Sequence, residues 1–222
     1  MIADPKPLSL VHRYRPAREA STGPTPLLVL LHGLGSNEED LFGLAPYFHP
    51  RIAIVSARAP LPYSMGGYSW FEMAFTPQGL QMNMESALAC RDNVVRFMKE
   101  AQSAYGSAPA QTYLGGFSQG GGMTAGVLLA EPNLLAGAII MGGYVPTDLP
   151  VGETAPLSGK PIIMTHGEYD NVVPVQIARV ARPWLESLGL TVDYHEYPMA
   201  HQLSEDCIDD IDQWLVKRIG IE

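Results

Sequence analysis

The chain has 222 residues, of which 46% are hydrophobic and 17% are charged. This composition excludes an intrinsically disordered chain, because such chains combine few apolar residues with much charge. The net charge of −9 argues against nucleic acid as a partner, since the phosphate backbone is also negative. The longest apolar run, around residues 27–31, is too short to span a bilayer. We expect one domain over residues 1–222, in which residues 1–25 supply an edge strand and a turn-rich lead-in.

The cysteines and the N-terminus bear on the compartment. Cys90 and Cys207 form no Cys-x-x-Cys motif, so neither a zinc site nor a redox motif is predicted. Two buried thiols in a reducing compartment are the preferred interpretation, and a single disulfide is the alternative. The segment 1–26 lacks the apolar stretch of a signal peptide, which predicts a cytoplasmic protein. We interpret an acidic run near the C-terminus as a solvated helix face. Its members are Glu205, Asp206, Asp209, Asp210 and Asp212.

Short apolar runs alternate with helical patterns, which is typical of an α/β fold with a mostly parallel, twisted sheet and helices on both faces. The predicted strands cover residues 8–14, 27–31, 51–56, 111–115, 136–141, 160–165 and 191–197. The predicted helices cover residues 81–104, a segment that begins by residue 121, and residues 175–188 and 204–219. Residues 59–79 are rich in Pro and Gly and predict a long loop. No insertion is large enough to form a lid domain.

Residues 116–120 read Gly-Phe-Ser-Gln-Gly, between a predicted strand and a predicted helix. In that context G-x-S-x-G predicts a sharp turn that projects the serine hydroxyl above the sheet. The turn is strained, and we expect Gly116 and Gly120 to remove clashes that larger residues would cause. Gly121 and Gly122 each cost about 1 kcal/mol of helix propensity, which predicts close packing at the start of the helix. Ser118 is therefore the predicted nucleophile.

A serine nucleophile needs a histidine base, which an acidic residue orients. In G-x-S-x-G hydrolases the acid and then the histidine follow the serine. Three histidines follow the serine in this chain: His166, His195 and His201. His201 is preferred because it lies in a loop before the last helix, where its side chain can reach across to the serine. His195 lies inside a strand, and His166 comes before the best candidate for the acid.

The acid is expected in the turn that follows the strand at residues 160–165. Asp170 lies in this turn, where a short carboxylate is well placed to accept the imidazole N–H. Glu168 is the alternative, and we expect it to be exposed.

Acyl transfer forms an oxyanion, which two backbone N–H groups commonly stabilise. One is predicted at Gln119, which follows the nucleophile at a helix N-terminus. The other is predicted at Leu34, in the His-Gly-Leu-Gly-Ser segment of residues 32–36 that follows a strand. A dinucleotide-binding loop does not fit, because Glu38 stands where the third glycine of G-x-G-x-x-G belongs.

With these motifs placed, the chain resembles the phospholipase/carboxylesterase family of the α/β-hydrolase fold from about residue 26 to the last helix. The resemblance rests on Leu-Leu-His-Gly-Leu-Gly at 30–35, Gly-Gly-Phe-Ser-Gln-Gly-Gly at 115–121, His-Gly-Glu-Tyr-Asp at 166–170 with Val-Pro at 173–174, and Tyr-Pro-Met-Ala-His at 197–201. It implies a catalytic triad of Ser118, Asp170 and His201 and an oxyanion hole formed by the N–H groups of Leu34 and Gln119. It also makes a homodimer a reasonable expectation. Ala200 departs from the family pattern, which usually has glycine there, and we expect a slightly shifted turn that keeps the base.

These residues predict a serine carboxylesterase that hydrolyses short to medium acyl esters of small molecules, without metal or cofactor. By the resemblance, the apolar loop 66–75 borders the acyl pocket. The candidate pocket residues are Trp70, Phe71, Met73, Val172 and Val173. Ordinary loop packing is an equal alternative for them. Two other functions stay open: an acyl-protein thioesterase or lysophospholipase with a longer acyl channel, and a non-catalytic binding protein on the same scaffold.

Overall fold

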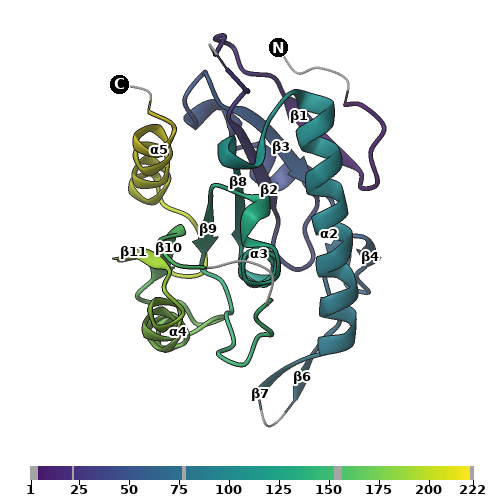
Figure 1. Ribbon diagram of the computed structural model, residues 1–222. Coiled ribbons are helices and arrows are strands. Elements are labelled where there is room, and N and C mark those ends of the chain that lie inside the picture. The colour runs from purple at the N-terminus through teal and green to yellow at the C-terminus, as the bar shows by residue number, and fades with distance from the viewer. Residues whose placement is uncertain (1–4, 22, 77–78, 153–156, 221–222) are drawn as a thin grey trace.

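The computed structural model describes residues 5–21, 23–76, 79–152 and 157–220. Its centre is a seven-stranded sheet with the strand order β1-β3-β2-β8-β9-β10-β11 (Figure 1). The strands are β1 (His12–Arg15), β2 (Leu27–Leu31), β3 (Ala53–Ala57), β8 (Thr112–Phe117), β9 (Gly137–Met141), β10 (Pro161–Gly167) and β11 (Thr191–Tyr197). β1 runs antiparallel to β3, and the other neighbours in this sheet run parallel. The predicted α/β fold with a mostly parallel sheet is confirmed.

Helices cover both faces of the sheet. One face carries α2 (Met84–Tyr105), α3 (Gln119–Ala130) and α4 (Val175–Ser187), and the other carries α1 (Glu38–Phe42) and α5 (Glu205–Ile219). Figure 1 shows α2 and α5 on opposite sides of the sheet. Leu27, Val29 and Leu31 of β2 pack in the first layer, whereas Leu28 and Leu30 pack in the second. This two-sided burial explains why the strand is apolar at every position. In the described part of the chain, no helix is long and apolar enough to cross a membrane.

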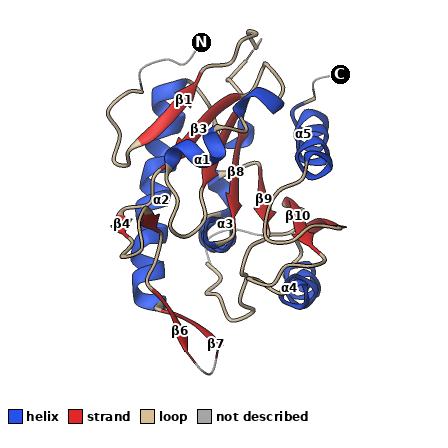
Figure 2. Ribbon diagram, turned by 180° about the vertical axis from the view of Figure 1, so that it is seen from behind, coloured by secondary structure: helices blue, strands red, loops and turns tan. Residues whose placement is uncertain are grey.

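The predicted long loop over residues 59–79 is wrong in part, because it contains two short hairpins. β4 (Leu61–Pro62) pairs with β5 (Tyr68–Ser69), and β6 (Met73–Thr76) pairs with β7 (Gly79–Met82). Residues 77–78 of the predicted loop lie outside the described residues. In Figures 1 and 2 the β6–β7 hairpin projects from the body of the protein beside the first turn of α2.

Element boundaries differ where local contacts decide them. The helix predicted from residue 81 begins at Met84, because β7 extends to Met82 and the side chain of Asn83 caps the helix by accepting the Ser86 N–H. The first strand covers His12–Arg15 rather than residues 8–14. β10 continues to Gly167, so that His166 belongs to the strand. The helix predicted from residue 204 begins at Glu205, and Ser204 caps it because its hydroxyl oxygen accepts the N–H of Cys207.

Both cysteines lie in the core. Cys90 in α2 and Cys207 in α5 are buried and are free thiols, as the preferred interpretation predicted. Burial raises the pKa of Cys90 to about 12 and the pKa of Cys207 to about 11. Both thiols are therefore protonated at neutral pH, which makes them poor nucleophiles.

The acidic run on α5 is solvated only in its first part. Asp210 accepts a hydrogen bond from the hydroxyl of Tyr197 at 2.7 Å, and Asp212 accepts the backbone N–H of His49 at 2.8 Å. Burial raises the pKa of Asp212. The predicted solvated face is wrong for these two residues, because they join α5 to β11 and to the segment that precedes β3.

Candidate active site

Ser118 occupies the turn between β8 and α3. Its φ of 55° and ψ of −115° make it the one non-glycine residue with positive φ in the described ranges. Such a conformation is strained and persists only when the surroundings hold it. A Cβ atom on Gly116 would lie 2.1 Å from the carbonyl oxygen of Gly120, and one on Gly120 would lie 2.1 Å from that of Leu31. The predicted need for glycine at both positions is confirmed.

The next two glycines allow α3 to approach the segment that follows β9. A Cβ atom on Gly121 would lie 2.9 Å from Cα of Gly143, and one on Gly122 would lie 2.5 Å from the carbonyl oxygen of Tyr144. These contacts confirm the close packing predicted at the helix start. They offset the low helix propensity of the glycines.

Three side chains that follow three strands form one chain of hydrogen bonds. Ser118 follows β8, Asp170 follows β10 and His201 follows β11. Nε2 of His201 lies 2.8 Å from Oγ of Ser118, and Nδ1 lies 2.6 Å from Oδ2 of Asp170. An imidazole with its proton on Nδ1 donates to the carboxylate and accepts from the serine hydroxyl. The structure thus brings together the three residues predicted as the triad, because parallel strands end at one edge of the sheet.

The carboxylate of Asp170 is held from several sides. The residue is 6% exposed, and its Oδ1 accepts the N–H groups of Val172 at 2.9 Å and Val173 at 2.8 Å. His166 is 1% exposed and donates from Nε2 to the carbonyl oxygen of Val173 at 2.7 Å. Its Nε2 also lies 3.5 Å from Oδ2 of Asp170, the oxygen that is 2.6 Å from Nδ1 of His201. His166, which the order of the motifs disfavoured as the base, therefore braces the turn that carries the acid.

The other sequence candidates lie away from this chain of hydrogen bonds. Glu168 is exposed, as expected. His195 lies on β11 with its Nε2 2.9 Å from a carboxylate oxygen of Asp193 on the same strand. Ala200 is exposed, and His201 keeps both of its hydrogen bonds beside it. Among the described residues, no group of three or more His, Cys, Asp or Glu side chains is arranged to hold a metal ion.

Leu34 and Gln119 line the same cleft as Ser118. In the turn after β2, the N–H of Gly35 donates to the carbonyl oxygen of Tyr68 at 2.9 Å. The N–H of Leu34 donates to no backbone oxygen of the described residues. Gln119 is the first residue of α3, where helix geometry leaves the N–H without an intrahelical partner. Both predicted donors are therefore available to a group bound in the cleft.

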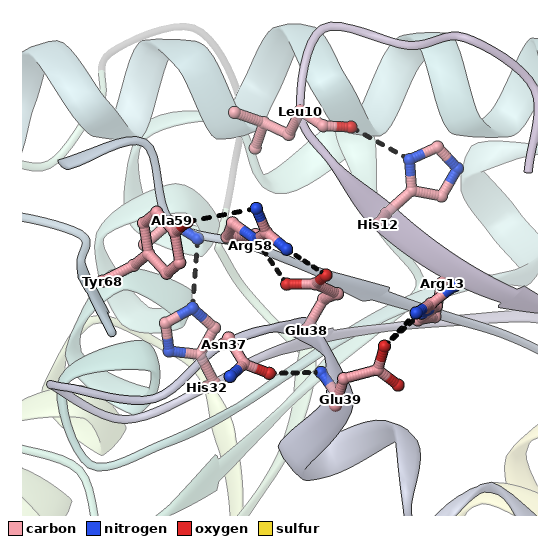
Figure 3. Close-up of polar contacts among 10 residues, drawn as sticks. All are labelled: Leu10, His12, Arg13, His32, Asn37, Glu38, Glu39, Arg58, Ala59 and Tyr68. Atoms are coloured by element: carbon pink, nitrogen blue, oxygen red, sulfur yellow. Dashed lines mark hydrogen bonds and ion pairs between the residues drawn. The ribbon is translucent and has the colours of Figure 1, made fainter. Parts of the chain in front are cut away.

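A polar network holds the turn after β2, and Figure 3 shows its contacts from His32 to Ala59 and from Glu38 to Arg58. His32 accepts the N–H of Ala59 at Nε2, with a distance of 3.1 Å, so that Nδ1 carries the proton and donates to the carbonyl oxygen of Gly33 at 2.7 Å. Burial lowers the pKa of His32, which keeps its ring neutral. Glu38 is buried and forms an ion pair with Arg58. The turn is thereby tied to the segment after β3.

The cleft beside Ser118 has a volume of about 210 Å³. Four predicted pocket residues line it: Phe71, Met73, Val172 and Val173. Trp70 does not, because its side chain is fully buried and its indole N–H donates to the carbonyl oxygen of His32 at 2.8 Å. The prediction of Trp70 as a pocket residue is therefore wrong. Neighbouring residues of an extended segment face opposite sides, so only one of Trp70 and Phe71 reaches the cleft.

Sequence reasoning missed two residues that line the cleft, Phe117 and Tyr144. The ring of Phe117 has its centroid 4.8 Å from that of His201. Its position directly before Ser118 in the motif was the available signal. Tyr144 follows β9, which neighbours β8, so the rule that sites form at the carboxyl ends of parallel strands also points to it.

Known proteins match this chain over most of its length. A model of the family described as Phospholipase/Carboxylesterase matches residues 17–219. A probable carboxylesterase, SOBER1-like, of Arabidopsis thaliana is 28% identical over 86% of this chain and 78% of its own length. Acyl-protein thioesterase 1 of Neurospora crassa is 26% identical over 88% of this chain and 87% of its own. The crystal structure of esterase PE8 is 26% identical and superposes with a TM-score of 0.81 over 94% of this chain and 98% of that one.

Proposed function

Because the chain belongs to the phospholipase/carboxylesterase family and is a hydrolase that acts on esters, we propose that it is a serine carboxylesterase with Ser118, His201 and Asp170 as its catalytic triad. The chain of hydrogen bonds of 2.8 Å and 2.6 Å through His201 carries this proposal. His201 takes the hydroxyl proton as Ser118 attacks the ester carbonyl, and Asp170 stabilises the imidazolium. The proton then passes to the leaving alcohol, and an acyl-enzyme stays behind. Water, deprotonated by His201, hydrolyses the acyl-enzyme and releases the acid.

We assign the oxyanion hole to the backbone N–H groups of Leu34 and Gln119. Two observations support this assignment: both residues line the cleft at Ser118, and both N–H groups are available to a ligand there. The N-terminus of α3 adds a favourable dipole to the negative charge that develops on the carbonyl oxygen. Donors of this kind are typically worth a factor of about 10²–10³ in kcat each.

The cleft favours acyl groups of short to medium length. Its volume of about 210 Å³ lies below the roughly 300–1,000 Å³ of sites that hold drug-sized ligands. One observation favours the alternative activity, a thioesterase or lysophospholipase with a longer acyl channel. A second, apolar groove shares Phe71 and Tyr144 with the cleft. With a volume of about 30 Å³ the groove must widen before it can hold a long acyl chain.

The two buried free thiols support a reducing compartment, and we place the enzyme in the cytoplasm on that ground. A homodimer stays a prediction. Light scattering coupled to size exclusion would measure it directly.

The proposed activity is tested with p-nitrophenyl esters from acetate to palmitate. The parent should be most active between butyrate and octanoate, and a fluorophosphonate probe should label it. Ser118→Ala should lose both properties, whereas Ser103→Ala, at an exposed serine of α2, should keep them. Parental activity in Ser118→Ala would refute the assigned nucleophile. A maximum at laurate or longer would favour the alternative activity, and a parent that is neither active nor labelled would favour the binding protein.

A further inference from the structure

The residue after the proposed nucleophile has a side chain that the mechanism above does not use. Gln119 is only 3% exposed. Its Oε1 accepts the backbone N–H of Trp70 at 2.8 Å, and its Nε2 donates to the carbonyl oxygen of Phe71 at 2.8 Å and to Oγ of Ser69 at 3.0 Å. Both ends of the amide thus bind the segment 69–71, which begins at the last residue of β5 and leads to the second hairpin.

The segment 69–71 depends on such contacts for its position. The hairpins that flank it are only a few residues long, and isolated hairpins are marginally stable at best. The indole of Trp70 anchors it on one side through the carbonyl oxygen of His32. The amide of Gln119 anchors its backbone on the other side. The start of α3 therefore holds this segment against the turn that follows β2.

Phe71 is the residue through which the position of this segment can affect substrate binding. Its side chain lines the cleft at Ser118 and also the second apolar groove, whose other walls include Met82, Leu88 and Met123. An acetyl group on Ser118 is too small to depend on this wall. A longer acyl chain must pack against Phe71 wherever it leaves the cleft, so a shift of the segment changes the binding of long acyl groups first.

We propose that Gln119 is a positioning residue that sets acyl-chain specificity. Its side-chain amide fixes the position of Phe71, while its backbone N–H faces the oxyanion. The inference rests on the proposed function. The substrates affected are esters whose acyl chain is long enough to reach Phe71. One residue then sets both the position of the carbonyl oxygen and the position of the acyl wall.

Replacement of Gln119 by methionine tests the inference, because methionine has a similar length and cannot hydrogen-bond the segment in the same way. The backbone N–H of Trp70 then loses its acceptor, and the carbonyl oxygen of Phe71 keeps only the hydrogen bond from the hydroxyl of Ser69. The segment must shift for the N–H of Trp70 to find another acceptor. Gln102→Met is the matched control. Gln102 is a 6% exposed glutamine of α2, and its Nε2 donates to the carbonyl oxygen of Leu134 at 2.8 Å.

The readout is the ratio of kcat/KM for p-nitrophenyl octanoate to that for p-nitrophenyl acetate. Damage to the oxyanion hole lowers both values alike and cancels in the ratio, as does a loss of folded protein. We expect the ratio to fall about tenfold in Gln119→Met, mainly through a higher KM for octanoate, since lost ground-state contacts raise KM. Gln102→Met should keep the parental ratio.

An unchanged ratio in Gln119→Met, or an equal fall in Gln102→Met, would overturn the inference. A parent that hydrolyses neither ester would overturn the proposed function and this inference with it, and that outcome is visible before any variant is made. If Gln119→Met does not fold, Gln119→Glu takes its place. A protonated glutamate can donate to Phe71 and an ionised one cannot, so the ratio should fall as pH rises. A parental ratio at every pH would contradict the proposed role.

Discussion

Two glycines of α3, Gly120 and Gly126, should respond to alanine in opposite directions. A Cβ atom on Gly126 would have nothing within 4 Å, whereas one on Gly120 would lie 2.1 Å from the carbonyl oxygen of Leu31 and 2.7 Å from that of His32. Alanine gains up to about 1 kcal/mol of helix propensity over glycine. At Gly126 no steric clash opposes this gain in helix propensity, so the free energy of unfolding should rise by about 1 kcal/mol.

At Gly120 the contact outweighs the gain, because the atoms it meets belong to the backbone at the end of β2 and cannot rotate away. Restoring even a 3.0 Å separation from the carbonyl oxygen of Leu31 requires the start of α3 to move by about 0.9 Å. Overpacking of this kind typically costs about 1–3 kcal/mol. Ser118 precedes Gly120 by two residues and moves with it. A displacement of about 1 Å at a reacting group can cost about 10²-fold in rate.

The experiment compares the parent, Gly120→Ala and Gly126→Ala in two assays. Urea denaturation with an unchanged m value reports stability, and hydrolysis of p-nitrophenyl acetate reports the chemical step. Gly120→Ala should be less stable by up to about 2 kcal/mol, the overpacking cost less the gain in helix propensity, and about 100-fold less active. If Gly120→Ala matched Gly126→Ala in both assays, close approach to β2 would not be the reason for glycine at position 120.

Three further predictions concern charge and protonation. Asp170→Asn retains the shape of the acid but not its charge, so kcat should fall about 10⁴-fold in steady-state kinetics, and the circular dichroism spectrum should stay parental. Burial lowers the pKa values of His12 and His32 below their ordinary 6.5, so the unfolded chain takes up these protons first as pH falls. The free energy of unfolding should therefore decrease below pH 6.5 by up to about 1.4 kcal/mol per pH unit for each histidine. Urea denaturation at several pH values should show that the free energy of unfolding of His12→Gln depends less on pH than that of the parent. Finally, a disulfide reagent at neutral pH should modify Cys90 and Cys207 only after unfolding, and rapid modification of the native protein would contradict their burial.

The sequence was most informative where close backbone contact restricts the choice of residue. Gly116 and Gly120 are required by contacts of 2.1 Å, and such a requirement leaves a visible pattern around Ser118. Asp170 and His201 could be assigned because each directly follows a strand of a parallel sheet, and such positions meet at one edge. The chain order of the three residues then excluded the histidines that precede Ser118 and disfavoured His166, and the position inside a strand disfavoured His195.

The features that the sequence did not predict depend on contacts between distant segments, which periodicity does not reveal. The two hairpins in residues 59–82 are too short to show a strand pattern, and β6 and β7 lie beside α2 rather than in the main sheet. Trp70 and Phe71 are both large and aromatic, so composition alone could not say which one faces the cleft. The bonds of Gln119 span 48 residues or more, and no local pattern marks them.

The first turn of α3 contacts three segments around the proposed site. Gly120 contacts the end of β2, which leads to the oxyanion turn at Leu34, and Gly122 contacts Tyr144 in the cleft wall. Gln119 binds the segment that carries Phe71. The glycines of this turn and the side chain of Gln119 therefore hold the turn at Leu34 and the segment at Phe71 close to Ser118, which are the oxyanion hole, the acyl wall and the nucleophile of the proposed function. It follows that substitutions in this turn should change rate and acyl specificity together.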